Sequence, residues 1–277
     1  MTGGPLSFYP PPYLCPMKRT LLLIFTASVI LLLVGCKEEV ATPIDFSADY
    51  EYFPLELNRP VFYAMDSIVI FNTVRGIVYD TTRLEVRETL VESFTAADGR
   101  ETFRGERWDR VLPNGTFRFA QTYTVSRDQT TAVRSEDNLT FTKLTFPIRE
   151  NKRWDGNAAF DDTREIPVGG EFLAVYRDWD YRYDQVGEPL TLPGGVQLEE
   201  TVTVEQAELT DVLIDYRVAY ERYAPGIGLV ERVIDARASQ CRTCCNGPNG
   251  PDFVACGNLS WDERAEEGYI LKQTYLR

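Results

Sequence analysis

The sequence predicts a mainly β protein, either an antiparallel sandwich or a partly open up-and-down barrel, and three observations support this fold class. From Ile214 to Tyr220 every second residue is large and apolar or aromatic, which places these side chains on one face of a strand and against a core. No window of the chain carries an apolar stripe with helical spacing over three turns. Turn-forming residues separate the candidate strands, at Asp98-Gly99, Pro113-Asn114-Gly115, Gly169-Gly170, Pro193-Gly194-Gly195 and Pro225-Gly226.

Further segments rich in Val, Ile, Thr and Tyr predict strands near residues 67–71, 84–94, 116–125, 139–146, 201–209, 228–234 and 269–276. All-β units of about 200–250 residues can form one domain. We therefore expect a single domain over residues 50–277, with a cysteine-rich loop at 238–262.

A short internal similarity predicts a division of this domain into two related halves. Phe53-Pro54-Leu55 is followed by Asn58, and Phe146-Pro147-Ile148 is followed at the same distance by Asn151. The boundary would lie near residue 145. The alternative is that Phe-Pro pairs only mark the start of strands.

Residues 17–35 have the order of a secretory signal peptide, with Lys18-Arg19 before an apolar stretch and small residues before a cysteine. The apolar stretch, residues 21–34, is shorter than the roughly 20 residues that a membrane-spanning helix needs. Its end, Leu33-Val34-Gly35-Cys36, resembles the lipobox of bacterial lipoproteins. The resemblance implies that Cys36 is diacylated and anchors the protein in a membrane, since two acyl chains hold stably. The alternative is an ordinary signal peptide, or a buried core segment, with a chance cysteine.

The residues around the lipobox carry two further expectations. Residues 1–16 contain no charged residue, so we expect translation to start at Met17 and the mature chain to begin at Cys36. Lys37-Glu38-Glu39 resembles the surface-export signal of lipoproteins from Bacteroides-type Gram-negative bacteria, which implies an outer-membrane location and exposure at the cell surface. The alternative is a solvated acidic linker over residues 36–49, which leaves the periplasmic face open.

Two phrases in the mature chain resemble a group of uncharacterised lipoproteins from the same bacteria. They are Tyr52-Phe53-Pro54-Leu55 near the start and Tyr223-Ala224-Pro225-Gly226-Ile227-Gly228-Leu229-Val230 near the end. The resemblance implies the same location and a β architecture, and it implies no activity.

Charge and composition exclude several function classes. The formal net charge is −13, and basic patches with interleaved aromatic residues are missing from the sequence, so we expect no nucleic-acid partner. The chain has no histidine, which excludes Ser-His-Asp, Cys-His and His-dependent zinc chemistry. The serine-elbow, P-loop and dinucleotide motifs are also missing. We therefore predict that the protein is not an enzyme and has no cofactor.

One tract nevertheless offers a candidate ligand contact. On a strand, Trp179, Tyr181 and Tyr183 would share one face and Asp178, Asp180 and Asp184 the other. The aromatic face could bind a sugar, two carboxylates could hydrolyse a glycan, and the three aspartates could form an irregular calcium site. The simpler interpretation is an edge strand with its aromatic residues inward.

The second constellation is Cys241, Cys244, Cys245 and Cys256. Four thiolates could hold zinc, and Cys-x-x-Cys also occurs in redox proteins. In an exported protein an even number of clustered cysteines normally forms disulfides, so we expect two disulfides and no metal. A bond between the adjacent Cys244 and Cys245 would be strained, which disfavours the pairing that joins Cys241 to Cys256.

These observations together favour a lipid-anchored envelope protein with a non-catalytic β scaffold. Its partners would be the membrane, through the acyl chains on Cys36, and an unidentified protein, glycan or lipid. One alternative is a carrier that holds a lipid or other hydrophobic ligand in a half-open barrel. Another is a glycan-binding module or a carboxylate-dependent glycan hydrolase.

Overall fold

The computed structural model describes residues 45–168 and 171–277. The expected signal peptide, the lipidation site Cys36 and the export signal Lys37, Glu38 and Glu39 lie outside the described residues. Residues Asp45–Arg277 form a compact unit by themselves. No helix among the described residues is long and apolar enough to span a membrane.

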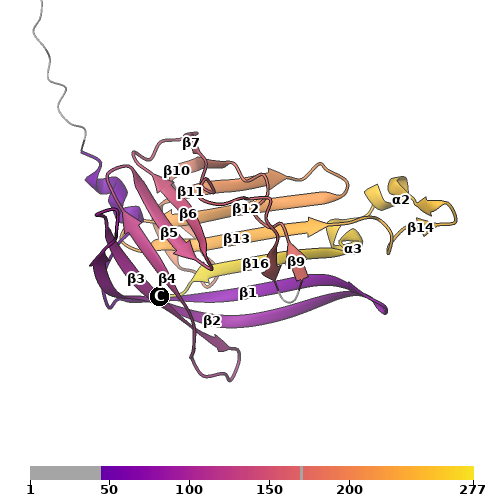
Figure 1. The fold of residues 1–277 in the computed structure, drawn as a ribbon, viewed down its shortest axis with the longest axis horizontal. Coiled ribbons are helices and arrows are strands. Elements are labelled where there is room, and N and C mark those ends of the chain that lie inside the picture. Colours follow the sequence, from indigo (N-terminus) through magenta and orange to yellow (C-terminus); the bar gives the residue numbers. More distant parts are fainter. Residues whose placement is uncertain (1–44, 169–170) are drawn as a thin grey trace, which may run out of the picture. The chain divides into compact units, whose positions relative to one another are not determined.

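A single antiparallel sheet of twelve strands dominates this unit, which confirms the mainly β prediction (Figure 1). The strands follow one another in the order β6-β5-β4-β3-β2-β1-β16-β13-β12-β11-β10-β7. Their bounds are β1 (Pro60–Thr73), β2 (Gly76–Thr95), β3 (Glu101–Val111), β4 (Arg118–Arg127), β5 (Thr131–Glu136), β6 (Leu139–Thr145), β7 (Arg153–Trp154), β10 (Tyr181–Thr191), β11 (Gln197–Leu209), β12 (Asp215–Ala224), β13 (Gly228–Ala238) and β16 (Glu267–Tyr275).

The remaining elements are small. Two hairpins, β8 (Ile166–Val168) with β9 (Glu171–Leu173) and β14 (Asn246–Gly247) with β15 (Gly250–Pro251), lie outside the main sheet. A 3-10 helix, η1 (Ser47–Tyr52), precedes the sheet. Two short helices, α2 (Phe253–Gly257) and α3 (Trp261–Arg264), belong to the predicted cysteine-rich loop between β13 and β16.

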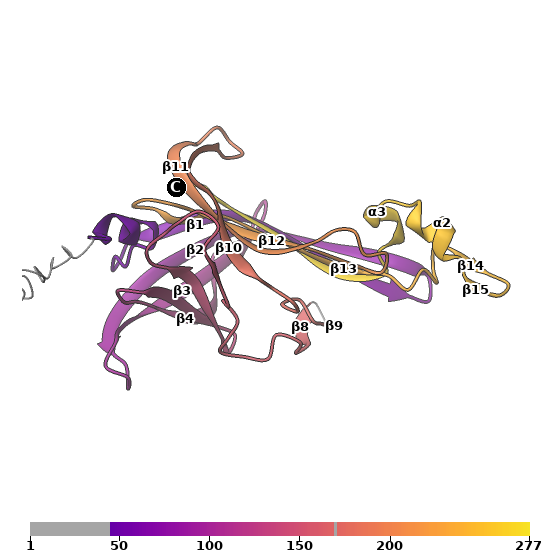
Figure 2. The same ribbon diagram turned by 90° about the horizontal axis from the view of Figure 1, so that it is seen from above.

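The sheet curls until its two edge strands meet. Figure 2 shows β3 and β4 turned out of the plane that contains β12 and β13. At the edges, the Thr142 amide of β6 donates a hydrogen bond to the Gly156 carbonyl, at 2.9 Å, and the Trp154 indole of β7 donates to the Thr142 carbonyl, at 2.8 Å. The chain therefore adopts the partly open up-and-down barrel of the two predicted forms.

Six strands of the main sheet precede residue 146 and six follow it, and the two sets pair where β1 lies beside β16. The two asparagines of the internal similarity occupy matching places. Asn58 and Asn151 both have φ of 62°. The backbone N–H of Asn58 donates to the Leu90 carbonyl, and the backbone N–H of Asn151 donates to the Tyr183 carbonyl. The relation between the halves stays a prediction, and this shared geometry supports it.

The face of β12 that points inward is not the expected one. Ile214, Tyr216, Val218 and Tyr220 were expected to face the core, yet Ile214 is half exposed and the other three are only partly buried. The buried set is Arg217, Ala219, Glu221 and Tyr223. The prediction was wrong because charged groups can lie inside when each is paired with an opposite charge, and the barrel interior supplies such partners.

Candidate functional site

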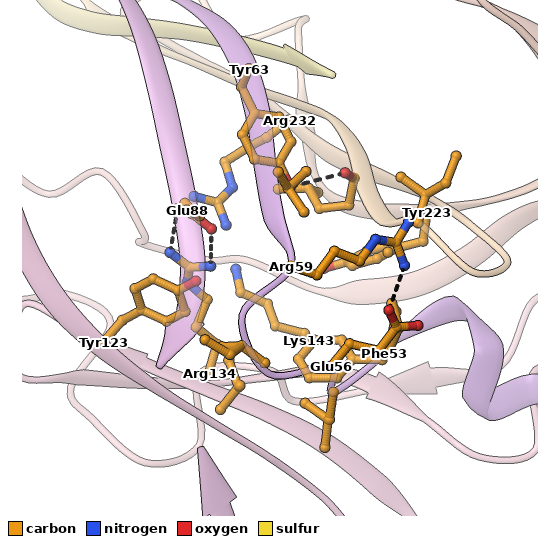
Figure 3. A pocket seen from close by; sticks show the side chains of 18 residues that line it. Phe53, Glu56, Arg59, Tyr63, Glu88, Tyr123, Arg134, Lys143, Tyr223 and Arg232 are labelled. Carbon is orange, nitrogen blue, oxygen red and sulfur yellow. Dashed lines mark hydrogen bonds and ion pairs between the residues drawn. The ribbon is translucent and has the colours of Figure 1, made fainter. Parts of the chain in front are cut away.

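A cavity at one end of the barrel combines an apolar rim with a charged floor (Figure 3). It has a volume of about 100 Å³. The rim consists of apolar residues from the segment after η1, from β2, from β4, from the β12–β13 turn and from the start of β13, namely Phe53, Pro54, Leu55, Leu90, Val125, Ile227 and Leu229.

Hydrogen bonds from both halves of the chain fix the segment after η1 at the rim. The Gly226 amide donates to the Glu51 carbonyl at 2.8 Å, and Arg127 Nη1 donates to the carbonyls of Tyr50 and Phe53. Gly228 has φ of 88°, and a Cβ atom there would lie 3.2 Å from Pro54 Cδ. A glycine therefore suits the close approach of the β12–β13 turn to this segment.

Two tyrosines form part of the wall. Tyr63 of β1 and Tyr123 of β4 are both buried, and the Tyr63 hydroxyl donates to the Leu229 carbonyl at 3.2 Å. Tyr123 lies across from Gly105 in the β3–β4 pair, and a Cβ atom on Gly105 would come within 2.1 Å of the ring. Because Gly105 has no side chain, the Tyr123 ring can pack directly over it.

The floor belongs to a network of six charged side chains, three acidic and three basic, of which all but the partly buried Glu136 are buried. Arg134 donates to both carboxylate oxygens of Glu88, at 2.9 and 2.8 Å, and its Nε donates to Glu136 at 2.8 Å. Glu221 Oε1 accepts from Lys143 Nζ at 2.8 Å and from Arg232 Nε at 2.7 Å. Arg232 also lies 3.6 Å from Glu136, which joins the two groups into one network.

The network holds its carboxylates in the ionised form. Burial by itself would raise the pKa of Glu221, but the charges of Lys143 and Arg232 outweigh burial and lower this pKa to about 2. Burial also opposes ionisation of Glu88, and Arg134 again reverses the effect and lowers its pKa. For Lys143 burial dominates, and its pKa is lowered despite the attraction of Glu221.

The predicted sugar-binding residues belong to the core instead. Trp179, Tyr181 and Tyr183 are all buried, and Trp179 lies before β10 rather than on it. The Tyr181 hydroxyl donates to Asn157 and the Tyr183 hydroxyl to the Thr145 carbonyl. Their burial gives no support to a ligand contact at these three residues and agrees with the inward-facing alternative, because aromatic area and hydroxyl groups are both satisfied within the core.

The aspartates of the same tract do not form a paired site. Asp180 makes an ion pair with Arg153, and Asp178 lies 3.7 Å from Arg177. Within residues 45–168 and 171–277, the one group of three potential metal ligands that lie close together is Cys244, Cys245 and Cys256. The geometry therefore gives no support to a calcium site or a carboxylate pair in this tract.

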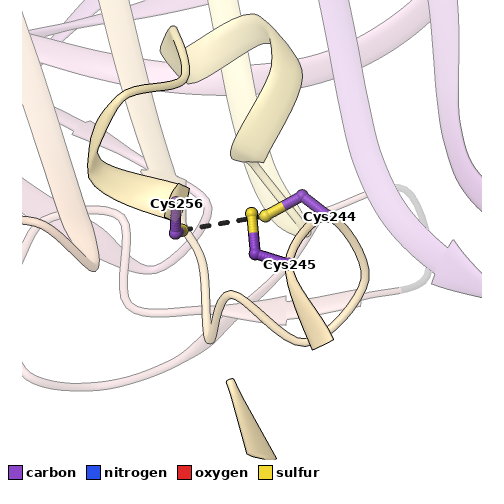
Figure 4. A group of neighbouring side chains, drawn as sticks. All are labelled: Cys244, Cys245 and Cys256. Atoms are coloured by element: carbon purple, nitrogen blue, oxygen red, sulfur yellow. Dashed lines mark hydrogen bonds between the residues drawn. The ribbon is translucent and has the colours of Figure 1, made fainter. Parts of the chain in front are cut away.

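The cysteines pair in the way that the sequence argument disfavoured. A disulfide joins Cys241 to Cys256, with 5.8 Å between their Cα atoms. Cys244 and Cys245 are free thiols, and Figure 4 shows both beside Cys256. The prediction assumed that all four cysteines are bonded, so that this pairing would force a strained bond between neighbours. With Cys244 and Cys245 unbonded, the objection does not apply.

With one disulfide formed, the cysteine group has a structural role. The disulfide ties the start of the loop at Cys241 to α2, and it removes two of the four thiolates that a tetrahedral zinc site would need. Cys244 Sγ lies 3.7 Å from Cys256 Sγ. Burial, followed by the neighbouring Cys245, raises the pKa of the Cys244 thiol to about 11, which keeps it protonated at neutral pH.

Sequence reasoning missed the charged floor, although one signal pointed to this place. The two phrases that resemble lipoproteins of Bacteroides-type bacteria lie at the cavity, where Phe53, Pro54 and Leu55 face Tyr223 and residues 227–229. The two groups are separated by about 170 residues in the sequence, and both line the same cavity.

Comparisons with known proteins yield two loosely similar folds. No protein-family model and no curated protein matches the sequence. A crystal structure from Bacteroides fragilis, described as an exported protein with a YmcC-like fold, shares 11% identity over 80% of this chain and 96% of its own, with a TM-score of 0.33. A structure from Parabacteroides distasonis, described as a lipoprotein, has the same identity and coverage and a TM-score of 0.32. These superpositions are too loose to transfer a family or a function to this chain.

Proposed function

We propose that this chain is a lipid-anchored protein of the bacterial envelope that binds a small amphipathic molecule and does not transform it. One observation carries the proposal: the cavity at the barrel end joins an apolar rim to a charged floor. Ligand sites commonly combine an apolar lining with a few fixed polar groups in this way. The anchor would be Cys36, which rests on the lipobox alone.

The state of the floor residues supports binding rather than catalysis. The carboxylates that could act as acids, Glu88 and Glu221, are held ionised by paired cations, so neither can donate a proton at neutral pH. Every charged group of the floor already has an opposite charge as its partner. The network therefore has the character of a rigid support.

The size of the cavity limits the ligand. A water molecule needs roughly 10–15 Å³ of such volume, so a cavity of about 100 Å³ accepts on the order of ten small groups. A long acyl chain cannot be enclosed completely. This favours a ligand that inserts one end, in place of the fully enclosed lipid of the carrier hypothesis.

Native mass spectrometry of the chain from Lys37 to Arg277, exported to an oxidising compartment, tests the proposal. We expect a copurified adduct on the wild type and its loss from Leu55→Trp, which fills the rim. Leu57→Trp is the matched control, because Leu57 is 43% exposed and does not line the cavity, so it should keep the adduct. An adduct that survives Leu55→Trp would place the ligand elsewhere and refute the site.

A further inference from the structure

We propose that the cavity selects a carboxylate, which accepts hydrogen bonds from Lys143 and Arg232 while its apolar tail lies along the rim. This inference rests on the proposed function, because it names the chemical class that the same cavity binds.

Cations outnumber carboxylates among the residues that line the cavity. The lining contains Arg59, Arg134, Lys143 and Arg232, against Glu56 and Glu88. Glu56 lies at the solvent-exposed rim, where it pairs with Arg59 at 3.1 Å. Two carboxylates of the network do not line the cavity, namely Glu136 and Glu221. Positive groups therefore face the cavity, and part of the balancing negative charge lies behind them.

The hydrogen bonds identify which cations can still donate. Arg134 is engaged through all three of its nitrogens, since Nε, Nη1 and Nη2 each donate to Glu88 or Glu136. Lys143 Nζ can donate three hydrogen bonds, yet among the described residues it has one acceptor, Glu221. Arg232 donates through Nε to the same Glu221, and within the part of the chain that the structure describes its terminal nitrogens have no hydrogen-bonded carboxylate, with Glu136 at 3.6 Å. Spare donors thus concentrate on Lys143 and Arg232.

These two side chains are close together and held in place. Both bond to the same oxygen of Glu221, at 2.8 and 2.7 Å, and Figure 3 shows both among the side chains that line the cavity. Lys143 belongs to β6 and Arg232 to β13. Lys143 is 4% exposed and Arg232 is 9% exposed. Both side chains line the cavity, so their unused donor positions are open to a ligand there, and a planar carboxylate can accept from both at once. A neutral head group would satisfy them less well, and a cationic one would meet like charge.

The apolar part of the ligand has a defined place. Leu55, Leu90 and Ile227 line the opening from three different parts of the chain. An alkyl chain attached to the bound carboxylate would pass between them toward solvent. This arrangement fits a short aliphatic carboxylate, or the carboxyl end of a longer molecule.

Isothermal titration of the wild-type chain from Lys37 to Arg277 with three matched probes tests the assignment. The probes are hexanoate, its neutral isostere hexanamide, and hexylammonium. We expect hexanoate to bind about tenfold more tightly than hexanamide, because hydrogen bonds to charged donors are stronger than those to neutral groups. We expect hexylammonium to bind more weakly than both. Equal binding of hexanoate and hexanamide, or a preference for hexylammonium, overturns the inference.

Two variants locate the selectivity. Lys143→Met should reduce hexanoate binding about tenfold and leave hexanamide binding within about twofold, whereas Lys143→Arg should restore the preference. If Lys143→Met fails to fold, Leu55→Trp should abolish binding of hexanoate and hexanamide alike, which still assigns the site. If hexanoate binds undiminished to Leu55→Trp, the assignment is wrong. Failure of all three probes on the wild type also refutes the carboxylate, while the proposed function is decided separately by the copurified adduct.

Discussion

Replacement of Glu221 by glutamine should cost about 3–4 kcal/mol of folding stability. Glu221 is 1% exposed and accepts hydrogen bonds from Lys143, Arg232 and the Tyr223 hydroxyl, the last at 2.5 Å. A fall in its pKa from 4.5 to about 2 corresponds to about 3 kcal/mol of stabilisation of the charged form. Loss of one partner from a buried ion pair typically costs about 3–5 kcal/mol, which agrees.

Urea unfolding at pH 7, followed by the fluorescence of the four tryptophans, measures this cost. We expect the midpoint for Glu221→Gln to fall without a change in slope. Glu199→Gln, at an exposed position of β11, is the control and should stay within about 0.5 kcal/mol of wild type. Lys143→Met added to Glu221→Gln should recover part of the loss, because it removes the cation whose ion pair was with Glu221, whereas Arg232 keeps Glu136 as a partner. A cost below about 1 kcal/mol for Glu221→Gln would contradict the account of the network.

Three further predictions concern acid, packing and the disulfide. The pKa of Glu221 is lower in the folded protein than in the unfolded chain, so its contribution to stability is present above about pH 4.5 and is lost toward about pH 2. The melting temperature should therefore fall through this pH window, and it should fall less in Glu221→Gln. Parallel curves for the two proteins would refute the assignment. Gly105→Ala places a Cβ atom against the Tyr123 ring and should cost about 1–3 kcal/mol by urea unfolding, whereas a neutral effect would show that the ring can move freely. Cys256→Ser should cost about 3 kcal/mol of folding stability, the value for a disulfide that closes a loop of about 15 residues. Cys241→Ser should cost less, because Cys244 Sγ lies 3.7 Å from Cys256 Sγ and can take the place of Cys241 in the disulfide. Peptide mapping that finds no Cys244–Cys256 bond in Cys241→Ser would contradict this prediction.

The sequence predicted the β architecture well because alternation and turn residues act locally. The strands expected near residues 84–94, 201–209 and 228–234 all lie within β2, β11 and β13. On β12 the same rule selected the wrong face, because it counts Arg217 and Glu221 as surface residues. Whether a charge can be buried depends on partners from other strands, such as Lys143 and Arg232, and local pattern does not contain that information.

The candidate site was beyond sequence reasoning for a related reason. Its rim joins Leu55 to Ile227 and its floor joins Lys143 to Glu221, pairs that lie far apart in the chain and meet only when the sheet curls. The aromatic tract at Trp179 attracted attention because its residues are neighbours in sequence. Their burial shows that dense aromatic composition indicates a core here.

The most direct test of the account is a crystal structure of the mature protein as purified from its native envelope. We predict density for a bound molecule between Leu55, Leu90 and Ile227, with an acceptor oxygen within hydrogen-bond distance of Lys143 Nζ. A cavity that holds only water, with ligand density elsewhere on the protein, would contradict the claim that this end of the barrel is the binding site.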